Sequence, residues 1–326
     1  MRKKAADLPP FHERAPWWGG DLQTLRNRLV RPAAMPSRAS ERLYFPLTDG
    51  SGDRLAAMLD RPRGPSSGPL IVLIHGLAGC EDSAYMRLSA AYHLRRQRRV
   101  LRLNLRGAGP SRRTCGGQYH SGCAPDIMDV LMALDNAELC EGLFLVGYSL
   151  GGNVLINLLA LYADDLPVRG AVTVSAAIDP AAATRRLMAP RNALYHRWLL
   201  NQMKRETASP CARLDESERR TILDARTILE FDDGFTAPRN GFKDAADYYA
   251  RTAANRVLSA VPVPILMVQA RNDPWIPPDA YLDIKKTHLP NITLALHAGG
   301  GHVGFHDRGY KDTWYDRHTS SFLDNV

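Results

Sequence analysis

The 326-residue chain lacks an apolar run long enough to cross a membrane. Its apolar stretches are short, and one of the longer ones, residues 154–163, is interrupted by Asn157. A membrane-spanning helix needs about 20 predominantly apolar residues. Basic residues open the chain, but prolines and polar residues follow where a secretion signal would place an apolar stretch. We therefore expect neither a transmembrane protein nor export by that route.

The chain has few cysteines, and their spacing is not typical of a disulfide-linked protein. The chain has five cysteines and no C-x-x-C pair. They are Cys80, Cys115, Cys123, Cys140 and Cys211. An odd number without close pairs fits neither a disulfide framework nor a structural zinc site. The simplest interpretation is a protein of the reducing cytoplasm.

Positive charge is in modest excess over negative charge. The formal net charge is +8, and it comes largely from arginine. Four arginines gather in residues 95–99, where they end an amphipathic stretch carrying Leu88, Tyr92 and Leu94 on its other side. This pattern favours a solvated helix face. It predicts no specific nucleic-acid partner, and it leaves peripheral contact with an anionic membrane open.

No repeat or low-complexity tract is visible, and short apolar runs alternate with longer helical patterns instead. The strand candidates are residues 70–74, 100–105, 143–146, 171–174, 265–268 and 292–296. Helical stretches are expected near residues 84–97, 124–138, 150–163, 279–286 and 311–323. Continuously apolar strands separated by helices are typical of a mostly parallel sheet covered on both faces. The predicted fold class is therefore α/β, with a hairpin of residues 42–47 and 54–59 ahead of it.

Three parts of the chain differ in composition and in hydrophobic pattern. Residues 1–40 contain prolines and the pair Trp17-Trp18, which predicts an extended arm that packs on the core by its aromatics. Residues 41–178 and 259–326 are expected to form the α/β core. Residues 179–258 contain no convincing strand, which predicts a helical insertion placed as a lid, followed by the next helix of the core. A helical layer with no part in binding is the alternative.

A serine motif stands at the end of one predicted strand. Gly147-Tyr148-Ser149-Leu150-Gly151 follows residues 143–146 and runs directly into the helical stretch that begins near residue 150. A strand that turns this sharply into a helix needs glycines beside the serine. The Ser149 hydroxyl would then stand at a helix N-terminus, where developing negative charge is favoured. A helix-capping serine is the alternative interpretation of the motif alone.

A serine hydroxyl needs a base and a group that orients the base. In sheets of this kind the chain order is serine, then a carboxylate after a later strand, then histidine after the next. Asp273 follows residues 265–268, and His302 follows residues 292–296 within a glycine-rich turn. The order therefore predicts Asp273 as the orienting acid and His302 as the base.

Other residues compete for both roles. His297 and His306 lie nearest to His302, but neither sits in so glycine-rich a turn. Asp279 follows two prolines and is expected to start a helix, where a carboxylate usually caps. Asp232 or Asp233 is a remote alternative for the acid.

Acyl transfer also needs donors aimed at the oxyanion. The backbone amide of Leu150 would supply one, and the amide of Leu77, in the glycine-containing turn after residues 70–74, would supply the second. His75 is expected to fix this turn by hydrogen bonds. Polar residues in 104–107 and 119–122 are expected to hold loops near the site, with substrate contact as the alternative.

With these residues identified, the chain resembles the YheT family of α/β-hydrolases, which is related to hydrolase-domain esterases, lipases and phospholipases. The resemblance extends from about residue 15 to residue 323, and it includes Leu22-Gln23-Thr24 near the start of the chain. Its motifs are Pro16-Trp17-Trp18, His75-Gly76-Leu77, Asn104-x-Arg106-Gly107, Tyr119-His120-Ser121-Gly122, Gly147 to Asn153, Phe231-Asp232, Thr236-Ala237-Pro238, Gly241-Phe242, Asp247-Tyr248-Tyr249, Asp273-Pro274 and Gly300 to Phe305. The resemblance implies an α/β-hydrolase fold with a triad of Ser149, Asp273 and His302.

The predicted function is a cytoplasmic serine carboxylesterase that uses no metal or organic cofactor and forms an acyl-enzyme on Ser149. Medium-chain acyl esters or lipid esters are the expected substrates, since the 179–258 region is rich in apolar residues. An acyltransferase with the same acyl-enzyme is one alternative, and the H-x-x-x-x-D spacing of His302 and Asp307 is compatible with it. A non-catalytic basic scaffold is another. The physiological ester and the oligomeric state stay open.

Overall fold

A computed structural model describes residues 9–30, 34–287 and 289–326. An eight-stranded sheet runs through the molecule in the order β1-β2-β4-β3-β5-β6-β7-β8. The strands are β1 (Ser37–Pro46), β2 (Arg54–Pro62), β3 (Leu70–Ile74), β4 (Val100–Leu103), β5 (Leu143–Tyr148), β6 (Val168–Val174), β7 (Ile265–Ala270) and β8 (Ile292–His297). From β4 to β8 all neighbours are parallel. The predicted α/β class is confirmed.

The predicted hairpin forms one edge of this sheet. β1 pairs antiparallel with β2, and β2 pairs antiparallel with β4. Gly50 and Gly52 in the connecting turn have φ of 77° and 73°, in the left-handed region that glycine tolerates best. The hairpin therefore extends the parallel sheet without a crossover helix.

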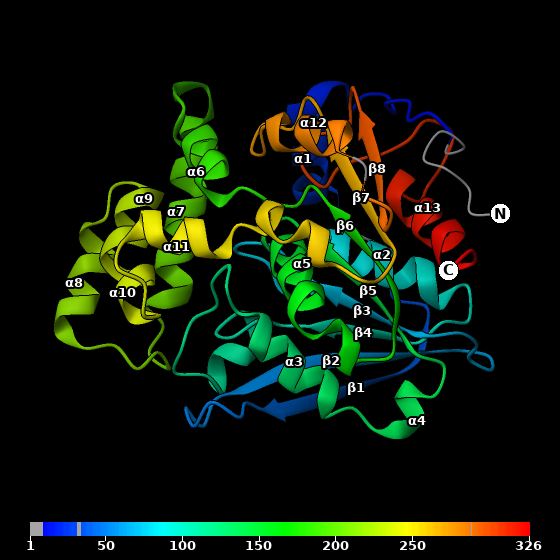
Figure 1. Cartoon of the computed structure of the whole chain (residues 1–326), viewed down its shortest axis with the longest axis horizontal. Helices are drawn as coiled ribbons and strands as arrows, with labels where there is room; N and C mark the ends of the chain where they lie inside the picture. Colours follow the sequence, from blue (N-terminus) through cyan, green and yellow to red (C-terminus); the bar gives the residue numbers. More distant parts are fainter. Residues whose placement is uncertain (1–8, 31–33, 288) are drawn as a thin grey trace.

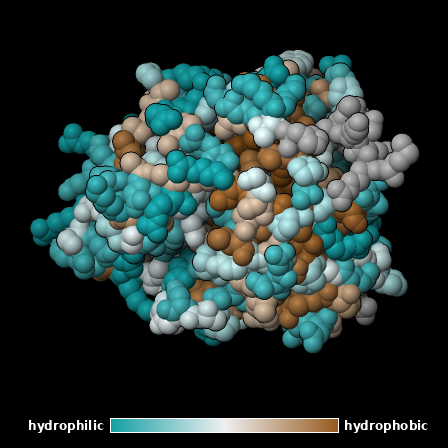
Figure 2. Space-filling view, in the orientation of Figure 1, coloured by the Kyte–Doolittle hydropathy of each residue, from teal (hydrophilic) through white to brown (hydrophobic). Residues whose placement is uncertain are grey.

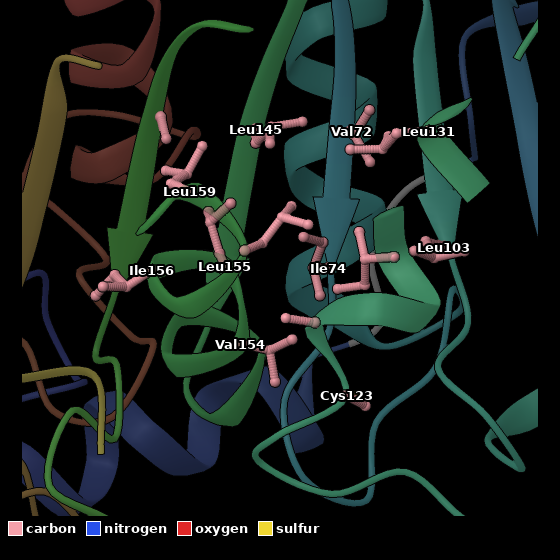
Figure 3. Close-up of a cluster of buried hydrophobic side chains, with 14 of the residues drawn as sticks. Val72, Ile74, Leu103, Cys123, Leu131, Leu145, Val154, Leu155, Ile156 and Leu159 are labelled. Atoms are coloured by element: carbon pink, nitrogen blue, oxygen red, sulfur yellow. The ribbon is translucent and has the colours of Figure 1, made fainter. Parts of the chain in front are cut away.

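Helices cover both faces of the sheet because its central strands are apolar on both faces. In β3, Leu70, Val72 and Ile74 pack in one cluster, while Ile71 and Leu73 pack in the other. Figure 3 shows the first cluster, in which strand side chains meet the apolar face of the helix after β5. The helices of that face are α3 (Ala124–Met132), α5 (Leu150–Tyr162) and α12 (Asp279–Lys286), whereas α2 (Ala84–Leu94) and α13 (Trp314–Leu323) cover the opposite face. The short helix α4 (Asn136–Leu139) precedes β5.

A helical segment without strands separates β6 from β7, and every residue of it is described (Figure 1). Its helices are α6 (Pro180–Met188), α7 (Ala193–Thr207), α8 (Glu216–Asp224), α9 (Ile228–Phe231), α10 (Ala237–Arg239) and α11 (Ala245–Thr252). Short 3₁₀ turns and one π turn complete the description: η2 (Gly109–Arg113), η3 (Ala163–Asp165), η4 (Pro190–Asn192), η5 (Asp232–Thr236), η6 (Ala254–Arg256) and η7 (Leu258–Ala260). The segment has its own apolar cluster, centred on Leu199, Ile222 and Phe231. Figure 2 shows a mostly hydrophilic outer surface over these helices, so their apolar side chains lie inside.

The N-terminal region differs from the predicted extended arm. Residues 19–29 form the helix α1 (Gly19–Leu29), and β1 already begins at Ser37. The prolines at positions 9, 10 and 16 precede this helix and do not interrupt it. The Trp18 side chain is 59% exposed, whereas the polar Gln23 and Thr24 are buried. The sequence pattern missed α1 because its buried face is polar. Residues 1–8 and 31–33 of the arm lie outside the described residues.

Among the described helices, none combines the length and apolar character required to cross a bilayer.

Candidate active site

Ser149 lies at the sharp turn between β5 and α5. Its φ of 52° and ψ of −121° place a non-glycine residue in a sparsely populated backbone region. The Ser149 amide donates a 2.9 Å hydrogen bond to the Val174 carbonyl of the neighbouring strand, which fixes the turn. A Cβ on Gly151 would stand 2.3 Å from the His75 backbone oxygen. The glycine therefore allows α5 to start directly against the end of β3, as the motif predicts.

Three loops bring Ser149, His302 and Asp273 together. His302 Nε2 lies 3.0 Å from Ser149 Oγ, and His302 Nδ1 lies 2.9 Å from Asp273 Oδ2. Asp273 is fully buried, and its other oxygen accepts the amides of Trp275 and Ile276 at 2.8 and 3.0 Å. With Nδ1–H donating to the carboxylate, Nε2 is left to accept the serine proton. The geometry is that of a proton relay.

Helix α1 supports the His302 loop from the far end of the chain. The His302 amide donates a 2.8 Å hydrogen bond to Thr24 Oγ1, and Asn27 Nδ2 donates to the Val303 carbonyl at 2.7 Å. The Gly301 amide donates to Asn272 Oδ1 at 3.0 Å. The sequence analysis did not predict Thr24 as a supporting residue. The one sequence signal for this residue is the Leu22-Gln23-Thr24 motif.

Two tyrosines hold the loop after β3. The Gly76 amide donates to the Tyr85 hydroxyl at 3.0 Å, and the Ala78 amide donates to the Tyr119 hydroxyl at 2.7 Å. The amide of Leu77 between them makes no hydrogen bond with the described residues. A Cβ on Gly76 would stand 2.8 Å from Ser149 Cβ, so the loop passes directly beside the serine. The Leu77 amide is thus available close to Ser149. The Leu150 amide begins α5, where such groups have no helical acceptor.

His75 fixes this loop, as the sequence predicts. Its Nε2 accepts the Leu105 amide at 3.1 Å, and its Nδ1 donates to the Gly76 carbonyl at 2.8 Å. Burial lowers the pKa of His75 to about 4, which keeps the ring neutral in this arrangement.

The polar residues after β4 also hold loops. Asn104 Oδ1 accepts the Glu81 amide at 2.8 Å, and Arg106 forms ion pairs with Asp49 and Asp126, both at 2.7 Å. Tyr119 and His120, by contrast, line the cavity beside Ser149. Both motifs therefore hold loops, since Tyr119 also accepts the Ala78 amide, and only the 119–122 motif lines the cavity.

The competing histidines take part in other contacts. His297 packs edge-on against Trp314 with ring centroids 4.4 Å apart, and His306 lies 3.1 Å from both Arg26 and Asn27. Burial lowers the pKa of His297 to about 4 and that of His306 to about 3. Neither contacts Ser149 through a hydrogen bond among the described residues.

The competing carboxylates are also bound elsewhere. Asp232 accepts the hydroxyls of Tyr249 and Thr236 at 2.6 and 2.9 Å, and Asp233 accepts the Ala245 amide. Asp279 is the first residue of α12, after Pro278 at the N-cap position. Asp307 pairs with Arg317 and accepts the His12 amide at 3.0 Å. His302 contacts Asp273 in their place.

Two hollows meet at Ser149. One, which we call the lid cavity, reaches under the helices between β6 and β7. Its apolar lining includes Leu187, Leu199, Met203, Ile228 and Phe231. The other, which we call the arm groove, passes between the loop after β3, α1, α2 and the His302 loop.

Glu206 and Asp232 both line the lid cavity, and Glu206 is linked to the loop after β3. Glu206 of α7 accepts the Tyr119 hydroxyl at 3.2 Å, and burial raises the pKa of this carboxyl to about 7. Tyr119 therefore links the helical segment to the Ala78 amide.

In the described residues, no group of three or more His, Cys, Asp or Glu side chains is arranged to hold a metal ion.

Comparison with known proteins agrees with this architecture. Residues 69–309 match the model of the alpha/beta hydrolase fold family. The Escherichia coli (strain K12) protein named "Putative esterase YheT" is 33% identical over 288 residues, covering 87% of this chain and 83% of that protein. An abhydrolase domain-containing protein of Dictyostelium discoideum is 32% identical, covering 79% and 68%. Phospholipase ABHD3 of Mus musculus is 27% identical, covering 74% and 59%.

A solved structure supports the same fold. The Pyrococcus furiosus esterase Pf2001 superposes with a TM-score of 0.62 at 15% identity, over 90% of this chain and 97% of that one. The family match spans most of the chain, and the E. coli relative matches nearly end to end. The resemblance drawn from the motifs is therefore confirmed: the chain belongs to the YheT family of α/β-hydrolases.

Proposed function

We propose that the chain is a serine carboxylesterase that forms an acyl-enzyme on Ser149. The single observation that carries the proposal is the relay from Asp273 through His302 to Ser149, with separations of 2.9 and 3.0 Å. The coarser prediction, a carboxylic ester hydrolase, is confirmed by the family and by relatives named as esterase, phospholipase and monoacylglycerol lipase.

The reaction follows from the geometry around Ser149. His302 Nε2 accepts the Ser149 proton while Oγ bonds to the ester carbonyl carbon, and Asp273 keeps Nδ1 protonated. The amides of Leu77 and Leu150 donate to the oxyanion. The ester C–O bond then breaks, and His302 returns the proton to the leaving alcohol. Water, deprotonated by the same histidine, releases the acid and restores Ser149.

The acyl chain is assigned to the lid cavity. Its apolar lining comes mostly from the segment between β6 and β7, and Ser149 and Leu150 are also among the lining residues. Burying a chain of methylene groups there contributes about 0.8 kcal/mol for each group. Medium-chain acyl esters, including lipid esters, are the substrates that this lining supports.

The cytoplasm is the proposed compartment. All five cysteines lie in the described part of the chain and none forms a disulfide in it. Free thiols, two of them exposed, suit a reducing environment.

Labelling tests the nucleophile. A fluorophosphonate probe followed by peptide mapping should modify Ser149, and p-nitrophenyl esters of graded acyl length should be hydrolysed. Ser149→Ala should lower kcat about 10⁶-fold, the usual cost of losing such a nucleophile. The matched control is Ser217→Ala, an exposed helix-start serine remote from the relay.

The outcomes separate this proposal from its alternatives. Full turnover by Ser149→Ala would contradict the mechanism. Transfer of most acyl groups to an added alcohol instead of water would make the enzyme an acyltransferase. A chain that resists labelling yet sediments with vesicles or nucleic acid in a salt-sensitive way would be a binding scaffold.

A further inference from the structure

The two hollows that meet at Ser149 differ in which catalytic groups they reach. Ser149, Leu77 and Trp275 line both. Among the described lining residues, His302 belongs to the arm groove alone, and the aliphatic side chains of the helical segment, such as Leu187, Leu199 and Ile228, belong to the lid cavity. The two sides of the serine are therefore chemically distinct.

This difference orients the substrate, given the proposed function. The leaving alcohol must receive its proton from His302, so it must lie on the side that the His302 side chain lines. That side is the arm groove. The acyl half then occupies the lid cavity, and the alcohol half lies along α1 and α2.

The arm groove carries two cations with no acidic partner. Arg28 of α1 and Arg87 of α2 both line it, and neither makes an ion pair with a described residue. The Arg28 guanidinium stacks 3.6 Å from the ring centroid of Trp198 at the edge of the helical segment. Arg87 Nε is buried without a hydrogen-bond partner among the described residues.

The acidic groups near the groove pair with other arginines. Asp82, the one carboxylate among the described lining residues, is largely exposed and lies 3.2 Å from the Arg102 guanidinium, which also pairs with Asp60 at 2.7 Å. Neighbouring Glu81 pairs with Arg42. Arg28 and Arg87 therefore have no carboxylate partner among the described residues, in a concavity that opens on the reacting atoms.

We propose that the alcohol half of the substrate carries a phosphate monoester, which Arg28 and Arg87 bind in the arm groove. Two guanidinium charges match the nearly two negative charges of a phosphate monoester at neutral pH. The planar guanidinium also presents paired donors that suit phosphate oxygens. The phosphate is recognised and not transferred: only the carboxylic ester C–O bond breaks. The inference rests on the proposed function and adds the substrate class.

Three esters with one acyl chain test the preference. They are 1-octanoylglycerol, 1-octanoylglycerol 3-phosphate and 1-octanoylglycerophosphocholine, all kept as monomers. We expect kcat/KM for the phosphate monoester to exceed that for the neutral ester by about tenfold or more, since charge-assisted hydrogen bonds are the strong ones. The zwitterionic diester should fall between them, and added salt should reduce the preference.

Variants of the two arginines locate the effect. Arg28→Gln, Arg87→Gln and the double variant should lower the ratio of the two kcat/KM values, with the double variant bringing it near one. Arg87→Lys keeps the charge and should retain most of the preference. Arg220→Gln, on an exposed surface pair with Glu216, is the control and should leave the ratio as in the wild type.

Inhibition provides a measurement that needs no variant. Glycerol 3-phosphate should compete with p-nitrophenyl octanoate in the wild type, whereas glycerol at the same concentration should not. Hydrolysis of phosphatidate in vesicles as well as of the monomer would identify a lipid headgroup as the source of the phosphate. Hydrolysis of the monomer alone would identify a soluble ester.

The failure of this inference differs from the failure of the proposed function. A ratio near one in the wild type, or an undiminished ratio in the double variant, would overturn phosphate recognition while Ser149 still labels with fluorophosphonate. Absence of labelling and of p-nitrophenyl octanoate hydrolysis would overturn the esterase mechanism itself.

Discussion

The loop that carries Ser149 and the loop that carries His302 are held by different means. The serine turn is fixed by the central sheet: Ser149 has a positive φ, its amide donates to the Val174 carbonyl of β6, and glycines let α5 start against the end of β3. The histidine loop depends on α1, because the His302 amide donates to a threonine 278 positions away in the chain. The proposed nucleophile is thus held by neighbouring strands, while the proposed base is positioned by a helix from the far end of the chain.

The loop after β3 lies between these extremes. Its glycines bring it close to Ser149, but its amides on either side of Leu77 are tied to Tyr85 and Tyr119. Tyr119 in turn contacts Glu206 of α7. The loop that carries the Leu77 amide, the proposed oxyanion donor, is therefore held both by its own glycines and by a distant helix, and variants of each loop can test how far this comparison holds.

The largest effect is expected from crowding the serine turn. In Gly151→Ala the new Cβ would stand 2.3 Å from the His75 oxygen and 2.6 Å from the Ile74 oxygen, both backbone atoms that cannot rotate away. Alanine favours helices by about 1 kcal/mol over glycine, but overpacking against backbone costs about 1 to 3 kcal/mol. We expect kcat to fall about 100-fold or more, because the loop after β3 would be pushed away from Ser149.

The measurements are kcat for p-nitrophenyl octanoate and the melting temperature. Gly64→Ala is the control, since its Cβ would meet only the flexible end of the Gln97 side chain. Wild-type kcat in Gly151→Ala would show that the serine turn tolerates displacement of its neighbour, and the idea of a locally rigid nucleophile would be abandoned.

The same contrast explains what could be predicted from the sequence. The strands, the turn at Ser149 and the chain order that leads to Asp273 and His302 are short-range patterns, because buried parallel strands are continuously apolar and a tight turn requires glycine. These elements were all predictable. The relay's residues stay predictions until activity is measured, although their separations agree with the proposed roles.

Helix α1 could not be predicted from pattern. Its buried residues, Gln23 and Thr24, are polar, so no apolar stripe marks the face that packs on the core. Their burial depends on acceptors and donors in the His302 loop, which no local pattern contains. The pairing of Arg28 and Arg87 in the arm groove could not be predicted for the same reason. Helices α1 and α2 are distant in sequence and line one groove only in the folded chain.

A smaller effect is expected from loosening the histidine loop. Thr24→Val keeps the shape of the side chain but removes the acceptor of the His302 amide and the donor to the Gly20 carbonyl. A hydrogen bond of this kind contributes about 1 kcal/mol, so kcat should fall about fivefold as the imidazole moves relative to Ser149. Thr24→Ser keeps the hydroxyl and should restore most of the activity.

The kinetic parameters distinguish positioning from a general loss of fold. A positioning role predicts a lower kcat with KM for p-nitrophenyl acetate little changed, together with slower labelling of Ser149 by fluorophosphonate. If Thr24→Val loses active protein in proportion to its melting temperature, and its surviving fraction labels at the wild-type rate, α1 stabilises the fold without positioning the base.

The smallest effect, a change in melting temperature, is expected where the loop after β3 meets the helical segment between β6 and β7. Burial raises the pKa of Glu206 from 4.5 to about 7, so ionising this carboxyl opposes folding. Its stabilising contribution is therefore complete below about pH 4.5 and is lost as the pH rises through about 7. Glu206→Gln retains an acceptor for the Tyr119 hydroxyl but cannot ionise. At pH 8 its melting temperature should exceed that of the wild type by about 2 °C, and at pH 5 the gain should shrink toward zero.

Scanning calorimetry at the two pH values provides the measurement, with Glu216→Gln as the matched control. Glu216 is 74% exposed in its pair with Arg220, so its variant should differ from the wild type equally at both pH values. An equal shift for Glu206→Gln at pH 5 and pH 8 would mean that this carboxyl is solvated in the native state. The contact between Glu206 and Tyr119 would then be a surface contact. The loop after β3 would in that case be held mainly by its own glycines, like the Ser149 turn, and not by a distant helix, like the His302 loop.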